Sequence, residues 1–220
     1  MRMTLPNILT LIRLLAAPGI ILVFLLIPRP YADWLAFGLF VGASVTDYID
    51  GYLARKWNQI SRIGTMLDPI ADKAMVALAL LALAVWSPLK VAVILPGAVI
   101  LFREVFVSGL REFLGDVAGT LKVTKLAKWK TAVQMIAIAL LLAQGGLNTT
   151  LGMAVFGMDA PMITAILDGS EEDPLGIRGM LVRAEWAGYI GLILIWLAAG
   201  LTAITGWDYF SKARAHLGED

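Results

Sequence analysis

The chain has 220 residues, of which 59% are hydrophobic and only 16% are charged, and its formal net charge is +1. Soluble domains average roughly 45–50% apolar and about 25% charged residues, so this composition predicts a polytopic membrane protein and excludes an ordinary soluble enzyme. The chain has no cysteine, and its single histidine, His216, lies in a polar tail. Disulfides, thiolate metal sites and histidine clusters are therefore excluded, and acid–base chemistry must rest on carboxylates.

Six segments are long and apolar enough to be membrane-spanning helices, each of which needs about 20 mostly apolar residues. They are predicted at 8–28, 33–55, 65–86, 90–112, 129–148 and 186–207. The first segment contains Arg13 and has no small-residue cleavage site at its end, so we interpret it as a retained helix and not as a signal peptide. The predicted fold is an all-α integral membrane protein with six transmembrane helices, forming a single domain over residues 1–220.

The distribution of basic residues predicts that both termini are cytoplasmic. In that orientation, all of the 18 basic residues except Arg29, Lys90, Arg178 and Arg183 fall on the cytoplasmic side or at cytoplasmic helix ends. The segment 149–185 between the fifth and sixth helices is acidic and is expected to be an exterior loop. Its apolar first half could lie along the outer interface or form part of a dimer contact.

Four aspartates lie where the second predicted helix ends and the third begins. Residues three and four apart share a helix face, so Asp47 and Asp50 lie on one stripe, and Asp68 and Asp72 lie on another. Because only a short turn at 56–63 separates the helices, the stripes can face each other and bring four carboxylates together near the membrane surface. Oxygen-only donors suit Mg²⁺ or Mn²⁺, and four carboxylates favour two ions that clamp a phosphate-containing ligand.

Two other interpretations of these acids remain open. They could form a structural ion-pair network with nearby basic residues, or they could carry protons or cations, since ion transporters also bury acids. Gly51 and Ala54 leave the stripe of the second helix bare, so a ligand can approach the backbone closely, and this favours a binding site.

The spacing D-x2-D-G-x2-A-R-x8-G-x3-D-x3-D is complete between residues 47 and 72, and in this feature the chain resembles the CDP-alcohol phosphotransferase family. The stretches 5-LPNILTLIRLLAAP-18, 103-REVFVSGLREF-113 and 128-KWKTAVQM-135 resemble members of the family that use glycerol 3-phosphate. The resemblance implies a six-helix enzyme, usually a homodimer, in the bacterial cytoplasmic (inner) membrane, with its active site facing the cytoplasm. Such enzymes transfer the phosphatidyl group of CDP-diacylglycerol to an alcohol and release CMP.

The resemblance also implies roles for individual residues. Asp47, Asp50 and Asp68 would be ligands of two ions, Mg²⁺ or Mn²⁺, and Asp72 would be both a ligand and the base that removes the acceptor's hydroxyl proton. The residues expected to line the cytidine diphosphate site are Asn7, Thr10, Gly51, Ala54, Arg55, Ser61 and Gly64. Because the chain offers no Ser–His or Cys–His pair, direct in-line attack is favoured over a covalent enzyme intermediate.

The acceptor alcohol is predicted from basic residues, because glycerol 3-phosphate carries a dianionic phosphate. Arginine's fork suits phosphate oxygens, and lysine adds a point charge. The candidates are Arg103, Arg111, Lys130, Thr131 and Gln134. Lysines before the fifth helix also follow the positive-inside pattern, and Arg103 could instead pair with Glu104. Another acceptor, such as inositol phosphate, serine or a different polyol, remains an alternative.

Overall fold

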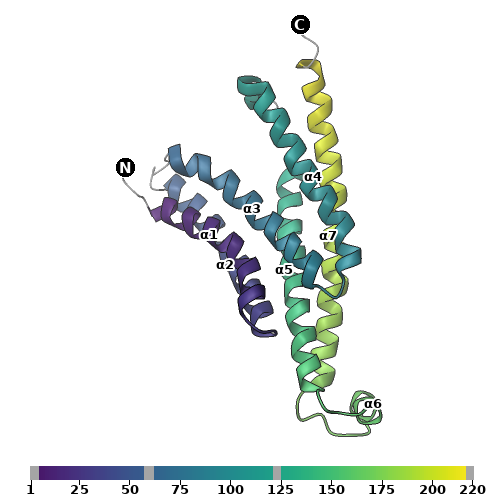
Figure 1. Cartoon of the computed structure of the whole chain (residues 1–220). Helices are drawn as coiled ribbons and strands as arrows, with labels where there is room; N and C mark the ends of the chain where they lie inside the picture. Colours follow the sequence, from purple (N-terminus) through teal and green to yellow (C-terminus); the bar gives the residue numbers. More distant parts are fainter. Residues whose placement is uncertain (1–4, 57–61, 121–124, 217–220) are drawn as a thin grey trace.

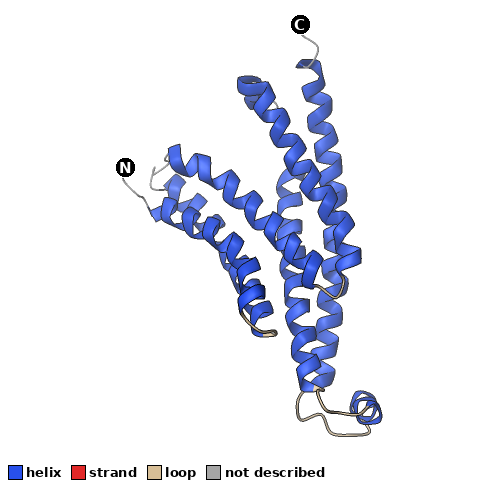
Figure 2. Ribbon diagram, viewed as in Figure 1, coloured by secondary structure: helices blue, strands red, loops and turns tan. Residues whose placement is uncertain are grey.

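The computed structural model describes residues 5–56, 62–120 and 125–216, and within these ranges every regular element is a helix. The α-helices are α1 (Leu5–Leu26), α2 (Tyr31–Lys56), α3 (Arg62–Trp86), α4 (Lys90–Leu114), α5 (Lys125–Ala154), α6 (Ala160–Asp168) and α7 (Ile177–Ala213). Short 3₁₀ turns follow α4 at Gly115–Thr120 and α7 at Arg214–His216. The prediction of an all-α fold is confirmed (Figure 2).

The six predicted segments correspond to α1, α2, α3, α4, α5 and α7, which are all longer than about 20 residues and alternate in direction along the chain (Figure 1). Within the described residues, five of these helices are long and apolar enough to cross a membrane, so the chain is a multi-pass membrane protein. Helix α2 is not among the five, because it carries Asp33 near its start and Asp47 and Asp50 near its end.

Two groups of helices are arranged side by side (Figure 1). In the first group, α1 packs against both α2 and α3. In the second, α7 packs against both α5 and α4. The groups are connected by α2, which packs against α5, and by α3, which packs against α4 and α5. The start of α1 and the end of α7 both lie at the end of the bundle that is opposite α6 (Figure 1).

The core consists of small and branched apolar side chains that let helices approach closely, as expected where lipid provides no hydrophobic drive between helices. Ala17, Ile20 and Phe40 are fully buried between α1 and its neighbours, and Leu141 and Ile195 are fully buried where α5 meets α7. Large apolar side chains cover the outside of the bundle, where a membrane protein meets the hydrocarbon of the bilayer. Examples are Leu15, Leu25, Val105, Phe113 and Ile193.

The contact between α5 and α7 requires a residue without a side chain at Gly191. A Cβ atom at this position would lie 2.9 Å from Leu141 Cγ, and Leu141 is fully buried and has no room to move aside. By contrast, a Cβ atom at Gly200, on the same helix, would have no neighbouring heavy atom within 4 Å.

We therefore expect Gly191→Ala to lower the free energy of unfolding by about 1–3 kcal/mol, the usual cost of overpacking. Gly200→Ala is expected to leave it unchanged or to raise it slightly, because alanine favours the helix more than glycine does. Thermal unfolding of both variants in detergent measures the difference. A Gly191→Ala protein as stable as the Gly200→Ala protein would contradict the packing described here.

The segment 149–185, which was predicted to be an exterior loop, is largely helical in the structure. Helix α5 continues to Ala154, and α6 begins where the Asp159 carboxylate caps the helix by accepting the Met162 N–H at 2.9 Å. Helix α7 begins at Ile177, because the Asp173 carboxylate accepts the N–H groups of Ile177 and Arg178. Burial raises the pKa of Asp173, but these hydrogen bonds and the Arg178 charge outweigh it, and its pKa falls below the ordinary value.

Candidate active site

The predicted acidic stripes lie at the end of the bundle that holds both the end of α2 and the beginning of α3. Asp47 lies on α2, and Asp68 and Asp72 lie one turn apart on α3. The remaining acid, Asp50, belongs to α2, but its side chain lies outside the described residues. The same holds for three predicted nucleotide contacts on α2, which are Gly51, Ala54 and Arg55. Ser61 lies wholly outside the described residues.

Arg13 of α1 joins the acids of α2 and α3. Its guanidinium Nη1 donates to Asp47 Oδ1, and the same nitrogen donates to Asp72 Oδ1 at 2.6 Å. The Arg13 side chain is only 2% exposed, whereas the two aspartate side chains are about half exposed. Two carboxylates from different helices therefore converge on one nitrogen atom.

The acids of α2 and α3 meet through an arginine of a third helix, which the spacing within α2 and α3 does not indicate. Helix α1 packs against both α2 and α3, and the polar face of α1 lies between their acids. The part that α1 plays in this convergence was missed, although an arginine within an apolar run, as at Arg13, was a signal that could have indicated it.

Further polar residues of α1 lie one turn apart on the same face as Arg13. Thr10 Oγ1 donates to Asp68 Oδ1 at 2.8 Å, so α1 contacts three of the four predicted acids. Asn7 is also buried, although it is polar and lies near the start of its helix. Of the two residues predicted on α1, Thr10 thus contacts an acid directly, and Asn7 lies one turn before it on the same helix. Gly64, at the start of α3, is partly buried.

The donor set at this position suits a hard divalent cation, because Asp47, Asp68 and Asp72 offer only carboxylate oxygens. Within the part of the chain that the structure describes, no three acidic or histidine side chains are close enough together to form a metal centre. The positive charge next to Asp47 and Asp72 is instead the Arg13 guanidinium. The acids therefore suit a hard cation in their chemistry, and in the structure Asp47 and Asp72 share the positive charge of Arg13.

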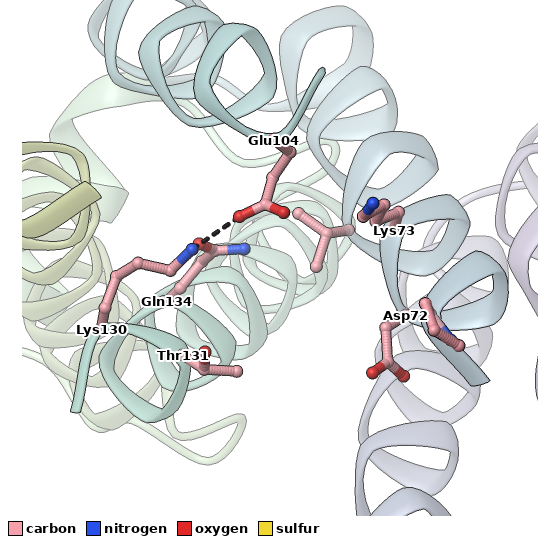
Figure 3. Close-up of a pocket in the computed structure, with 8 residues that line it drawn as sticks. Asp72, Lys73, Glu104, Lys130, Thr131 and Gln134 are labelled. Atoms are coloured by element: carbon pink, nitrogen blue, oxygen red, sulfur yellow. Dashed lines mark hydrogen bonds and ion pairs between the residues drawn. The ribbon is translucent and has the colours of Figure 1, made fainter. Parts of the chain in front are cut away.

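A cavity of about 210 Å³ opens beside Asp72 between α3, α4 and α5 (Figure 3). In this view Asp72 and Lys130 lie on opposite sides of the cavity, and Glu104 lies between them. The complete lining consists of Pro69, Asp72, Lys73, Val76, Glu104, Lys130, Thr131 and Gln134. Three of the five residues predicted to bind the acceptor phosphate therefore line one cavity together with Asp72.

Opposite charges are paired along the wall formed by α4 and α5. The buried Lys130 Nζ donates to Glu104 Oε1 at 2.6 Å, and Arg103 Nη1 donates to the same oxygen at 3.2 Å. On α3, Lys73 Nζ donates to Ser108 Oγ of α4. Glu104 and Lys73 were not predicted as site residues, because the sequence shows their charges but not which cavity they line.

Gln134 presents an unsatisfied polar atom to this cavity. Its side chain is 4% exposed, and among the described residues its Oε1 atom has no hydrogen-bond partner. A buried amide oxygen without a partner costs free energy, so a ligand that donates a hydrogen bond here would recover it. An amide oxygen accepts a hydrogen bond, which suits a hydroxyl group better than an ionised phosphate.

The two predicted arginines on α4 lie elsewhere. Arg103 packs its stem against α7, where a Cβ atom at Gly206 would lie 2.8 Å from Arg103 Cγ. Arg111 lies over the Tyr209 ring of α7, with its guanidinium carbon 5.3 Å from the ring centre. Neither arginine lines the cavity beside Asp72, and Arg103 borders a separate apolar groove of about 340 Å³ between α4 and α7.

Comparisons with known proteins point to one family. Residues 3–167 match the model of the CDP-alcohol phosphatidyltransferase family. A Cereibacter sphaeroides protein named CDP-diacylglycerol–glycerol-3-phosphate 3-phosphatidyltransferase is 54% identical over 220 residues, which is 100% of both chains. Proteins of the same name from Rickettsia bellii and Shigella flexneri serotype 5b are similar as well. The Rickettsia bellii protein is 38% identical over 96% of both chains. The Shigella flexneri protein is 33% identical over 99% of this chain and 98% of its own length.

Proposed function

Because the chain belongs to the CDP-alcohol phosphatidyltransferase family, we propose that it transfers the phosphatidyl group of CDP-diacylglycerol to sn-glycerol 3-phosphate. The products are phosphatidylglycerophosphate and CMP, so the reaction belongs to phospholipid biosynthesis. The names of the full-length relatives support this acceptor.

The cavity beside Asp72 is the observation that carries the proposal. Its volume of about 210 Å³ is smaller than the roughly 300–1,000 Å³ that drug-sized ligands occupy, so it suits a small polar molecule. One wall carries Asp72, and the opposite wall carries Lys130, Thr131 and Gln134 (Figure 3). An acceptor with a hydroxyl group at one end and a phosphate at the other matches these two walls.

In the proposed reaction the acceptor's hydroxyl oxygen attacks the phosphorus atom that carries the diacylglycerol group. A new P–O bond forms, the P–O bond to CMP breaks, and CMP leaves with the electron pair. Asp72 takes the hydroxyl proton as attack proceeds, and its value as a base comes from its position next to the hydroxyl group. Lys130 and Thr131 hold the acceptor's phosphate, and Gln134 Oε1 accepts a hydrogen bond from a second hydroxyl group.

The residues proposed to hold two divalent cations, Mg²⁺ or Mn²⁺, are Asp47, Asp50, Asp68 and Asp72. When bound, the cations neutralise the diphosphate of the donor and the charge that develops on the leaving CMP. The nucleotide is proposed to lie against α1, α2 and the start of α3. Its contacts are Asn7, Thr10, Gly51, Ala54, Arg55, Ser61 and Gly64.

Arg103 and Arg111 remain part of the proposed acceptor site in a different role from Lys130. Both lie on α4 outside the cavity, and Arg103 shares the Glu104 carboxylate with Lys130. This contact reduces the negative charge of Glu104 near an incoming phosphate. The two arginines would thus act mainly through the electrostatic potential of the site.

The remaining features of the proposal concern the membrane. We propose that residues 1–220 form one domain with six transmembrane helices, the sixth being α2, which runs antiparallel to α1 in the bundle (Figure 1). The excess of basic residues at the end that holds the acids supports cytoplasmic termini and a cytoplasmic active site in the bacterial inner membrane. A homodimer and an exterior position for 149–185 complete the proposal.

The choice of acceptor is tested by CMP release from CDP-diacylglycerol by the purified chain with Mg²⁺ or Mn²⁺. Parallel reactions contain glycerol 3-phosphate, serine, inositol phosphate or no acceptor. We expect release with glycerol 3-phosphate alone, because only that acceptor places a hydroxyl group at Asp72 and fits its phosphate to Lys130 in this small cavity. Release with serine alone would retain the chemistry and contradict the assigned role of Lys130.

A further inference from the structure

Arg13 places a permanent positive charge in the apolar helix α1. A guanidinium group stays protonated in proteins, and a charged side chain within a membrane-spanning segment is costly unless it is paired. The Arg13 side chain is 2% exposed, and the residues that follow it on α1 are apolar. The buried charge of Arg13 is therefore tolerated only because acidic side chains are paired with it.

Among the described residues, the partners of Arg13 include two of the four carboxylates proposed to hold the metal ions. Asp47 of α2 and Asp72 of α3 both accept from Arg13 Nη1. Two carboxylates this close repel each other, and the guanidinium offsets the repulsion and holds α2 and α3 against α1. Asp68 differs, because its partner on α1 is the neutral Thr10 hydroxyl group.

We propose that Arg13 is an internal counter-cation, which holds Asp47 and Asp72 together before metal binds and which a divalent cation must displace from them. This inference rests on the proposed function, since it takes the two aspartates to be metal ligands. The carboxylate oxygens that contact Arg13 Nη1 have the position and charge that a cation would use. Metal binding is then an exchange of one cation for another.

The exchange has a consequence for the order of binding. A guanidinium group displaced from carboxylates needs another anion, and a diphosphate is the anion that an arginine fork binds well. The donor's diphosphate would supply this anion beside the same acids. Metal should therefore bind weakly to the free protein and more tightly with the nucleotide, and by linkage the nucleotide should bind more tightly with metal.

The test uses the purified full-length chain in detergent and measures Mn²⁺ affinity by electron paramagnetic resonance, which detects free Mn²⁺. The variants are Arg13→Gln, which removes the charge, and Arg13→Lys, which keeps the charge without the fork. Arg29→Gln is the matched control, because it also removes an arginine that forms an ion pair with a buried aspartate, here Asp33. Asp33 also accepts a hydrogen bond from Thr149, which does not depend on Arg29. Each protein is measured with and without CDP, and its thermal unfolding is followed in EDTA and in Mn²⁺.

We expect Arg13→Gln to bind Mn²⁺ about tenfold or more tightly than wild type without CDP, because a unit positive charge beside the ion is gone. Arg13→Lys should have an affinity between the two, and Arg29→Gln should match wild type. Arg13→Gln should also unfold at a lower temperature in EDTA and gain more stability from Mn²⁺ than wild type does. In wild type, CDP should raise Mn²⁺ affinity, and this effect should be smaller in Arg13→Gln.

Two results would overturn the inference in distinguishable ways. If wild type binds Mn²⁺ and neither Arg13 variant binds it more tightly, the counter-cation role is wrong and the proposed function stands. If wild type binds no Mn²⁺ and Asp72→Asn changes nothing, the metal site itself is wrong, and the inference falls with it. Should Arg13→Gln fail to fold, the comparison of Arg13→Lys with wild type decides the question.

Discussion

Asp72→Asn is expected to lower the rate of CMP release by about 10³-fold or more, since a positioned general base alone contributes typically 10²–10⁴-fold. The asparagine amide cannot take the hydroxyl proton and offers a cation a neutral oxygen in place of a charged one. Asp72 lines the cavity and also shares Arg13 with Asp47, so the substitution affects both the acceptor site and the group of acids. The measurement is the initial rate of CMP release with saturating CDP-diacylglycerol and glycerol 3-phosphate.

Asp208→Asn serves as the control for Asp72→Asn. Asp208 forms an exposed ion pair with Lys212 near the end of α7 and does not line the cavity, so the variant makes the same chemical change outside the proposed site. It is expected to keep the wild-type rate. An Asp72→Asn protein that is folded and retains more than a tenth of the wild-type rate would contradict both roles proposed for Asp72.

Lys130→Gln is expected to raise the KM for glycerol 3-phosphate and to lower kcat/KM for this acceptor by about 10–100-fold. Hydrogen bonds to charged groups contribute about 1.5–3 kcal/mol, and Lys130 is the buried cation of the cavity wall opposite Asp72. The KM for CDP-diacylglycerol should stay close to that of wild type, because the proposed nucleotide contacts lie on α1, α2 and α3. Steady-state kinetics with each substrate varied in turn separates the two constants.

Lys212→Gln is the matched control for Lys130→Gln. It removes a lysine that pairs with an acid on its own helix and does not line the cavity. Both KM values should remain those of wild type in this control. If Lys130→Gln instead raises the KM for CDP-diacylglycerol and leaves that for glycerol 3-phosphate unchanged, the two substrates have been assigned to the wrong sides of Asp72.

Much of the fold follows from local physical rules and could be predicted from the sequence. Apolar runs of about 20 residues locate long helices in a membrane protein, and all six predicted segments are helical. The 149–185 segment was less accessible, because its structure depends on single capping residues. Asp159 and Asp173 each determine where a helix begins, and in the sequence neither differs visibly from the other acidic residues of this segment.

The site was predictable in its composition and less so in its arrangement. Helical spacing put Asp68 and Asp72 on one face of α3, and the basic residues that lead into the fifth helix indicated Lys130 as a contact of the acceptor's phosphate. Spacing within one helix does not say which third helix packs between two others, so the role of Arg13 was not foreseen. Helical spacing also could not show that Arg103 lies against α7 and not in the cavity. Arg103 can pack there because Gly206 of α7 has no side chain.

The central claim is phosphatidyl transfer at the Asp72 cavity, and a product balance tests it most directly. Purified chain is incubated with CDP-diacylglycerol, radiolabelled glycerol 3-phosphate and Mg²⁺ or Mn²⁺, and both CMP and labelled lipid are quantified. We expect equal molar amounts of CMP and phosphatidylglycerophosphate from wild type, and about 10³-fold less of both products from Asp72→Asn in the same time. Folded wild type that releases CMP without labelled lipid, or that releases no CMP but conducts ions into liposomes, would contradict the account.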